Sequence, residues 1–147
     1  MRARLAILSI ALLGACPAWA VLGQGVASVA SDQQRLKGQL RSAAAEGFSV
    51  HEITAADGTL VREYVSPAGE VFGVAWRGPA VPDLAELLGD YFPIFQEASR
   101  SDARRHRPLV VRTDRLVVEM GGHVRSFRGR AYLPERVPVA VSASVVR

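Results

Sequence analysis

The 147-residue sequence contains very little cysteine, lysine or histidine. Its single cysteine, Cys16, excludes a disulfide framework within one chain. Lys37 is the single lysine, so nearly all of the 18 basic side chains are arginine. The histidines His51, His106 and His123 lie far apart and lack the short spacing of a zinc site. We therefore expect no metal and no cofactor.

Catalytic sequence motifs are also absent. There is no Gly-x-Ser-x-Gly nucleophile elbow and no phosphate-binding Gly-x-x-x-x-Gly-Lys loop. With 49% hydrophobic and 22% charged residues, the composition is that of a globular protein and excludes a disordered tail. No apolar run reaches the roughly 20 residues that span a membrane, so we expect no transmembrane helix in the mature chain.

The N-terminus has the three parts of a secretory signal. Arg2 and Arg4 precede an apolar run over residues 5–13, and Ala18 and Ala20 place small residues where signal peptidase reads the chain. The pattern predicts a signal peptide over residues 1–20, followed by a single domain over residues 21–147. We expect a periplasmic or secreted protein.

A second processing route is open at Cys16. Leu13-Gly14-Ala15-Cys16 resembles a lipobox, whose cysteine is lipidated, although Pro17 is unusual directly after it. Cleavage after Ala20 would instead leave a mature chain without cysteine, which suits an oxidising compartment. The alternative is a lipid-anchored envelope protein.

Charge is divided unevenly between the two halves. Residues 21–97 hold 5 basic and 10 acidic side chains, whereas residues 98–147 hold 11 arginines and 4 acidic side chains. Such an imbalance indicates an anionic partner for the second half. The alternative is that the two halves attract each other within the fold.

Apolar alternation and turn residues predict an α+β fold with an antiparallel sheet. Asp57-Gly58, residues 66–69 and Gly121-Gly122 are expected to be turns. The segment 39–45 fits either a helix or a strand. We expect strands at residues 48–54, 60–65, 71–77, 109–112, 115–120 and 124–133.

A helical segment is expected between the third and fourth strands. Asp83 is a predicted N-cap, the apolar stripe runs over residues 84–95, and Pro93 fits the first turn of a second helix. Residues 99–107 are predicted to be a loop. The side chains expected to pack on the helix are Phe72, Val74, Trp76, Leu116, Val118 and Phe127. A flexible lead-in over 21–31 and a loose tail over 134–147 complete the domain.

The most suggestive cluster of side chains lies in residues 122–130. His123, Arg125, Arg128 and Arg130 surround Phe127, a pattern that can bind phosphates or a polyanion. The alternative is that these arginines protect the sheet from edge pairing. We expect no nucleic acid as partner, because an exported protein does not meet cytosolic nucleic acid.

Several longer strings carry a resemblance to a known family. They include His51-Glu52-Ile53, residues 61–69, Trp76-Arg77-Gly78-Pro79, residues 88–92 and residues 129–134. On these strings the sequence resembles a family of uncharacterised bacterial exported proteins, the domain of unknown function 2844. The resemblance covers nearly all of the mature chain. It implies export and a single domain, and it implies no activity.

We interpret the protein as a non-enzymatic binding or accessory module of the bacterial envelope. Its partner would be an unidentified, anionic envelope component that contacts His123, Arg125, Arg128 and Arg130. The alternative is a small envelope enzyme whose site is assembled from His51, His123 and a carboxylate such as Glu63.

Overall fold

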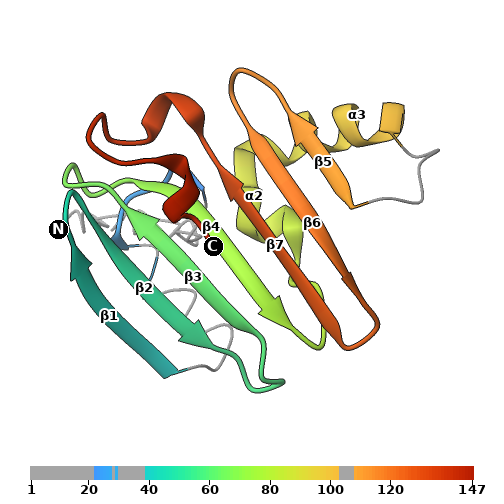
Figure 1. The fold of residues 1–147 in the computed structure, drawn as a ribbon, viewed down its shortest axis with the longest axis horizontal. Helices are drawn as coiled ribbons and strands as arrows, with labels where there is room; N and C mark the ends of the chain where they lie inside the picture. Colours follow the sequence, from blue (N-terminus) through green and yellow to red (C-terminus); the bar gives the residue numbers. More distant parts are fainter. Residues whose placement is uncertain (1–21, 28, 30–38, 103–107) are drawn as a thin grey trace, which may run out of the picture.

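The computed structural model of the protein describes residues 22–27, 29, 39–102 and 108–147. One seven-stranded antiparallel sheet dominates these residues, with strand order β1-β2-β3-β4-β7-β6-β5 (Figure 1). The strands are β1 Gln39–Ala45, β2 Phe48–Thr54, β3 Leu60–Val65, β4 Val71–Gly78, β5 Leu109–Arg112, β6 Val117–His123 and β7 Ser126–Tyr132. The predicted α+β class is confirmed, and the ambiguous segment 39–45 is a strand.

Turn chemistry explains the β2–β3 hairpin. Gly58 has φ +86°, a conformation that glycine adopts without steric cost. The Asp57 carboxylate accepts a 2.8 Å hydrogen bond from the backbone N–H of Thr59, which fixes the turn. The turn after β3 also forms as predicted, because Gly69 N–H donates to the Ser66 carbonyl over 2.9 Å.

The β6–β7 hairpin turns three residues later than predicted. β6 continues through Gly121 and Gly122 to His123, which pairs with Ser126, so the turn consists of Val124 and Arg125. Arg125 has φ +66°. Gly122 is required for a different reason than a turn: a Cβ atom there would overlap the main-chain oxygen of Ser126 on β7.

The helical segment comprises α2 Leu84–Leu88, the 3-10 turn η1 Gly89–Tyr91 and α3 Phe92–Asp102. Asp83 caps α2 as predicted, because its carboxylate accepts hydrogen bonds from the backbone of Ala85 at 2.8 Å and Glu86 at 3.3 Å. Pro93 lies in the first turn of α3. The predicted loop over 99–107 is wrong at its start, since α3 continues to Asp102.

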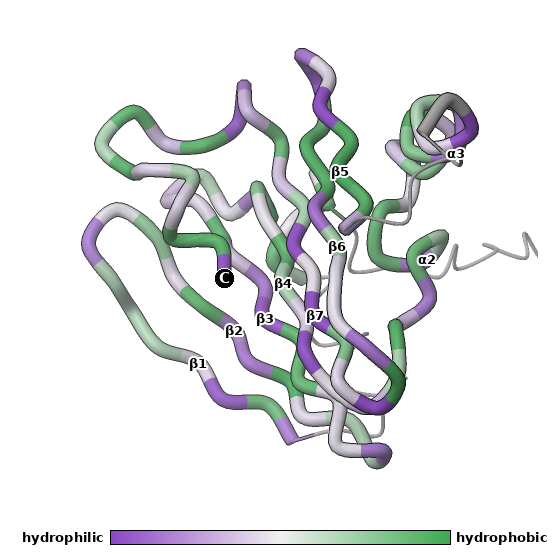
Figure 2. The backbone as a smooth tube through the Cα atoms, turned by 45° about the vertical axis from the view of Figure 1, so that its right-hand side comes forward, coloured by the Kyte–Doolittle hydropathy of each residue, from purple (hydrophilic) through white to green (hydrophobic). Residues whose placement is uncertain are grey.

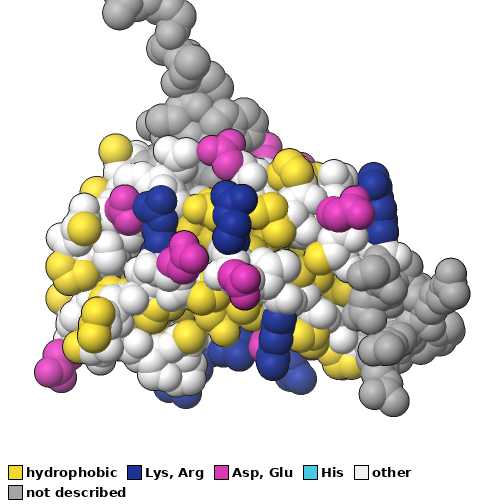
Figure 3. Space-filling view, turned by 90° about the horizontal axis from the view of Figure 1, so that it is seen from above, with side chains coloured by type: hydrophobic (Ala, Val, Ile, Leu, Met, Phe, Trp, Pro, Cys, Tyr) yellow, Lys and Arg dark blue, Asp and Glu magenta, His cyan; other side chains and the backbone are white. Residues whose placement is uncertain are grey.

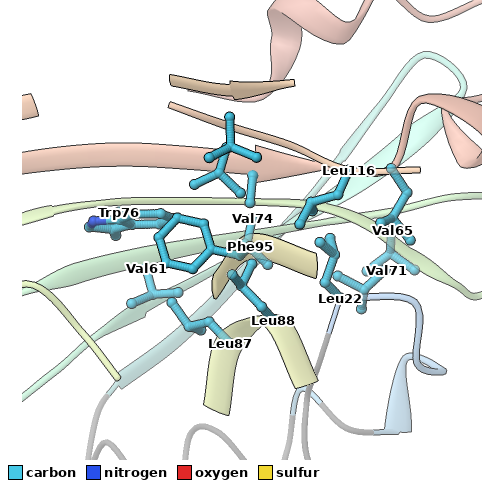
Figure 4. Packing of buried hydrophobic residues seen from close by; sticks show 14 of the residues in the cluster. Leu22, Val61, Val65, Val71, Val74, Trp76, Leu87, Leu88, Phe95 and Leu116 are labelled. Atoms are coloured by element: carbon cyan, nitrogen blue, oxygen red, sulfur yellow. The ribbon is translucent and has the colours of Figure 1, made fainter. Parts of the chain in front are cut away.

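The main core lies between the helical segment and one face of the sheet (Figure 4). Val74, Trp76, Leu116 and Val118 are buried there as predicted, against Leu87, Leu88 and Phe95 of the helices. Phe127 is half-buried and is not part of this core.

Phe72 packs on the opposite face of the sheet, contrary to the prediction. The register between β3 and β4 shifts at Tyr64/Val65: Tyr64 pairs with Gly73 and Val65 with Val71, so Phe72 is an extra residue. Such a β-bulge reverses the faces of the residues that follow it. Phe72 therefore joins a second cluster with Tyr64, Ala75 and Val146.

The C-terminal residues 134–147, which contain the 3-10 turns η2 Pro134–Arg136 and η3 Ala143–Val145, cover this second cluster. The segment crosses the sheet on the side opposite the helices (Figure 2). It differs from the loose tail expected. Val146 is fully buried, and the Tyr64 hydroxyl donates a 2.7 Å hydrogen bond to the main-chain oxygen of Arg147.

The described part of the predicted flexible lead-in is also held against the domain. Leu22 is buried, and its N–H donates to the Leu87 carbonyl over 3.1 Å. Gly25 forms an antiparallel bridge with Glu70. The predicted cleavage residues Ala18 and Ala20, and Cys16, lie outside the described residues. No helix of the described residues is long and apolar enough to cross a membrane.

Candidate anion-binding site

Strand pairing places a row of four residues across the sheet face that carries the C-terminal segment. Leu60 of β3 lies opposite Arg77 of β4, Arg77 lies opposite Arg128 of β7, and Arg128 lies opposite Gly121 of β6. We call Leu60, Arg77, Arg128 and Gly121 the arginine row. Directly opposite residues in an antiparallel sheet point to the same face, so both guanidinium groups emerge side by side.

A second row lies beside it on the same face, and there each arginine is bonded to a carboxylate. Arg62 donates to Glu52 over 2.8 Å. Arg112 donates to Glu119 over 2.8 Å, and Arg130 donates to the same carboxylate over 2.9 Å. The hydrogen bond from Arg112, followed by that from Arg130, lowers the pKa of Glu119 below its ordinary range. Each of these three arginines thus has a carboxylate partner, although Arg112 and Arg130 share that of Glu119.

The arginine row is not balanced in this way. Arg77 and Arg128 are both exposed, and among the described residues neither forms a salt bridge or a side-chain hydrogen bond. Like charges directly opposite each other in a sheet are unfavourable. The fold therefore keeps two adjacent positive charges at the surface without a counter-charge of its own.

Arg77 and Arg128, together with residues of the second row, line a hollow of about 610 Å³. A volume of this size is typical of small-molecule sites. Its charged lining consists of Arg62, Arg77, Arg128, Arg130, Arg147 and Glu119. Its apolar side chains include Leu60, Ala75, Trp76, Pro108, Val110 and Met120.

The wider surface is mixed in charge. Seen from above, basic side chains lie next to acidic ones, with hydrophobic side chains between them (Figure 3). Arg136 and Glu70 join the two halves of the chain through a 2.7 Å salt bridge. The pairs Arg62–Glu52 and Arg130–Glu119 instead lie within one half, so attraction between the halves accounts for only part of the charge pattern.

The structure separates the four binding residues predicted from sequence. Arg128 and Arg130 line the hollow, but Arg130 is held by Glu119. His123 and Arg125 lie at the β6–β7 turn, outside the lining of the hollow. Sequence reasoning missed Arg77. The sequence does indicate that Arg77 is exposed, because Arg77 follows the inward-facing Trp76 and must therefore face outward.

The alternative histidine site is brought together only in part. His51 of β2 lies opposite the buried Glu63 of β3. Ser42 and Ser49 lie 2.8 and 3.3 Å from the two ring nitrogens of His51, and burial lowers the pKa of His51. His123 is four strands away from β2, about 19 Å at ~4.8 Å per strand, and does not join them.

His106 lies outside the described residues. Within the part of the chain that is described, no group of three or more His, Cys, Asp or Glu side chains could hold a metal ion.

Together these features define a single α+β sheet domain with an arginine-lined hollow on the face opposite its helices. The family described as "Protein of unknown function (DUF2844)" matches residues 18–146, and the chain belongs to this family. No curated protein and no solved structure matches the chain.

Proposed function

We propose that this protein is an exported, non-enzymatic binding module that holds an anionic component of the bacterial envelope. The observation that carries the proposal is the arrangement of Arg77 and Arg128, which lie directly opposite each other at the surface of a hollow. A bound anion would supply the counter-charge that the described residues of the fold do not place there.

The chemistry of arginine supports binding of an oxyanion. The planar guanidinium group presents its N–H donors as a fork that matches carboxylate and phosphate oxygens, and it stays protonated at any physiological pH. Two such groups from neighbouring strands can contact the same anion. The sheet already holds both backbones in place, so binding an anion costs little backbone conformational entropy.

The state of Glu119 supports binding rather than proton transfer. Among the described residues that line the hollow, Glu119 is the one with an acidic side chain, and it accepts hydrogen bonds from Arg112 and Arg130. Those bonds lower the pKa of Glu119, whereas a general acid or base needs a pKa near the working pH. Support for export comes from the charge, apolar run and small residues of positions 1–20.

The arginine pair can be tested by its effect on phosphate binding. We expect R77Q/R128Q to weaken the binding of inorganic phosphate at least about tenfold, because each charge-assisted hydrogen bond contributes about 1.5–3 kcal/mol. Isothermal titration calorimetry at fixed ionic strength measures the dissociation constant.

The matched control is R41Q/R125Q, which removes the same charge from exposed positions outside the hollow. The control should bind phosphate like the unmodified chain. Equal weakening by both double variants would mean that net charge alone attracts phosphate, and the arginine row would then not be the site.

A further inference from the structure

An apolar surface lies beside the arginine row at its β6 end. On the β6 side, Gly121 has no side chain, and a Cβ atom there would lie 3.5 Å from the side chain of Pro108. Val110 of β5 is close by in the lining of the same hollow and is 41% exposed. We call Gly121, Pro108 and Val110 the apolar shelf. An exposed apolar surface beside paired charges is suited to a ligand that has both an anionic and an apolar part.

The two neighbouring arginines without a carboxylate partner point to a dianion. Arg77 and Arg128 lie opposite each other and together present two positive charges, whereas Arg62 is bonded to Glu52, and Arg112 and Arg130 share Glu119. A phosphate monoester carries close to two negative charges at neutral pH and three terminal oxygens. A carboxylate has one charge and two oxygens. The monoester therefore matches two guanidinium forks better than a carboxylate does.

Building on the function proposed above, we infer that the hollow binds a phosphate monoester with an apolar organic body. The phosphate group lies between Arg77 and Arg128, and the organic body lies on the apolar shelf. The same chemistry is found in a small soluble phosphate ester and in the exposed phosphate of an anionic lipid headgroup.

Calorimetry with three probes tests this assignment. Phenyl phosphate should bind about tenfold more tightly than inorganic phosphate, the gain expected when roughly half of a phenyl ring leaves water. Benzoate, which has the ring but a single charge, should bind more weakly than phenyl phosphate. The variant G121V fills the shelf and V110T makes it more polar, so both should reduce the gain from the ring, and V110T should do so while the binding of inorganic phosphate stays unchanged. V110T keeps the β-branched shape at an exposed position and provides the test if G121V does not fold.

The outcomes separate the two proposals. Binding of neither phosphate nor phenyl phosphate would overturn the proposed function and this inference together. Equal affinity for phosphate and phenyl phosphate would overturn the apolar shelf while leaving anion binding intact. Benzoate binding as tightly as phenyl phosphate would overturn the assignment of a phosphate ester.

Vesicle sedimentation distinguishes the two sources of the ligand. Vesicles of phosphatidylcholine with phosphatidic acid are compared with vesicles of phosphatidylcholine alone, using the unmodified chain and R77Q/R128Q. Sedimentation that requires both phosphatidic acid and the arginine pair supports the monoester and assigns it to a lipid headgroup. Binding of phenyl phosphate without sedimentation supports the monoester and assigns it to a soluble ester.

Discussion

Arginines that lie on one sheet face have different roles, and the difference depends on what lies opposite each of them. Arg130 faces Glu119 across the β6–β7 pair, donates to it through Nε over 2.9 Å and places Nη2 2.8 Å from the same carboxylate oxygen. Arg77 and Arg128 face each other. Replacing Arg125, Arg128 and Arg130 together would therefore remove a structural ion pair along with one residue of the proposed site. R77Q/R128Q avoids that confusion.

Glu119 should make stability depend on pH. Its pKa is lowered in the folded state, so its contribution is complete above the ordinary value of 4.5 and decreases as pH falls toward the lowered folded-state pKa. We expect the free energy of unfolding to fall between pH 5 and pH 3, and E119Q to lose less over this range than the unmodified chain. Urea unfolding at a series of pH values measures both slopes, and parallel slopes would contradict the role of Glu119.

At the scale of the elements, local chemistry made several features predictable. Asp57-Gly58 and Asp83 have their predicted roles because a turn or an N-cap depends on residues within a few positions of each other. The β2 strand, Phe48–Thr54, also has the predicted bounds. The same rule failed at Gly121-Gly122, because Gly122 is needed for the close approach of β7 rather than for a turn.

Features that depend on the register or the order of strands in the sheet could not be predicted. The face of Phe72 is decided by a bulge, and the bulge exists only in the register between β3 and β4. The arginine row depends on the pairing of β4 with β7, which brings Arg77 next to Arg128 across the helices and two further strands of sequence. Alternation gives the face of each residue in a regular strand, but it identifies neither a bulge nor the neighbouring strand.

The C-terminal segment is an element whose contribution to stability can be measured. Val146 is fully buried, and it fills the space above Gly73, where a Cβ atom would lie 2.7 Å from the Val146 side chain. V146A should lower the free energy of unfolding by about 2 kcal/mol, the cost of losing buried methyl groups.

Val139 provides the matched control, because its side chain is fully exposed in the same segment. V139A should leave urea unfolding unchanged. If V146A had as little effect as V139A, the segment would not be docked on the sheet in solution.

In the whole molecule, different segments cover the two faces of the sheet. The helices and the described N-terminal residues bury the main core on one face, as Leu22 and Leu88 show. The C-terminal segment and the arginine-lined hollow occupy the other face. Figures 1 and 2 show the helices and the C-terminus on opposite sides of the sheet. Arg77 and Arg128 can therefore be changed without disturbing the main core, whereas Trp76 belongs both to that core and to the lining of the hollow.

The proposed export of the whole molecule gives the last prediction. Cleavage after Ala20 leaves Val21 as the first residue, directly before Leu22, which is buried in the core. Mass spectrometry of the protein purified from the envelope fraction should give the mass of residues 21–147. A18R should block cleavage because a large charged side chain does not fit signal peptidase, whereas C16S should leave the mass of the mature chain unchanged. A mass that begins at Cys16 with added acyl chains, and is lost in C16S, would instead make the protein a lipoprotein and place the hollow at a membrane surface.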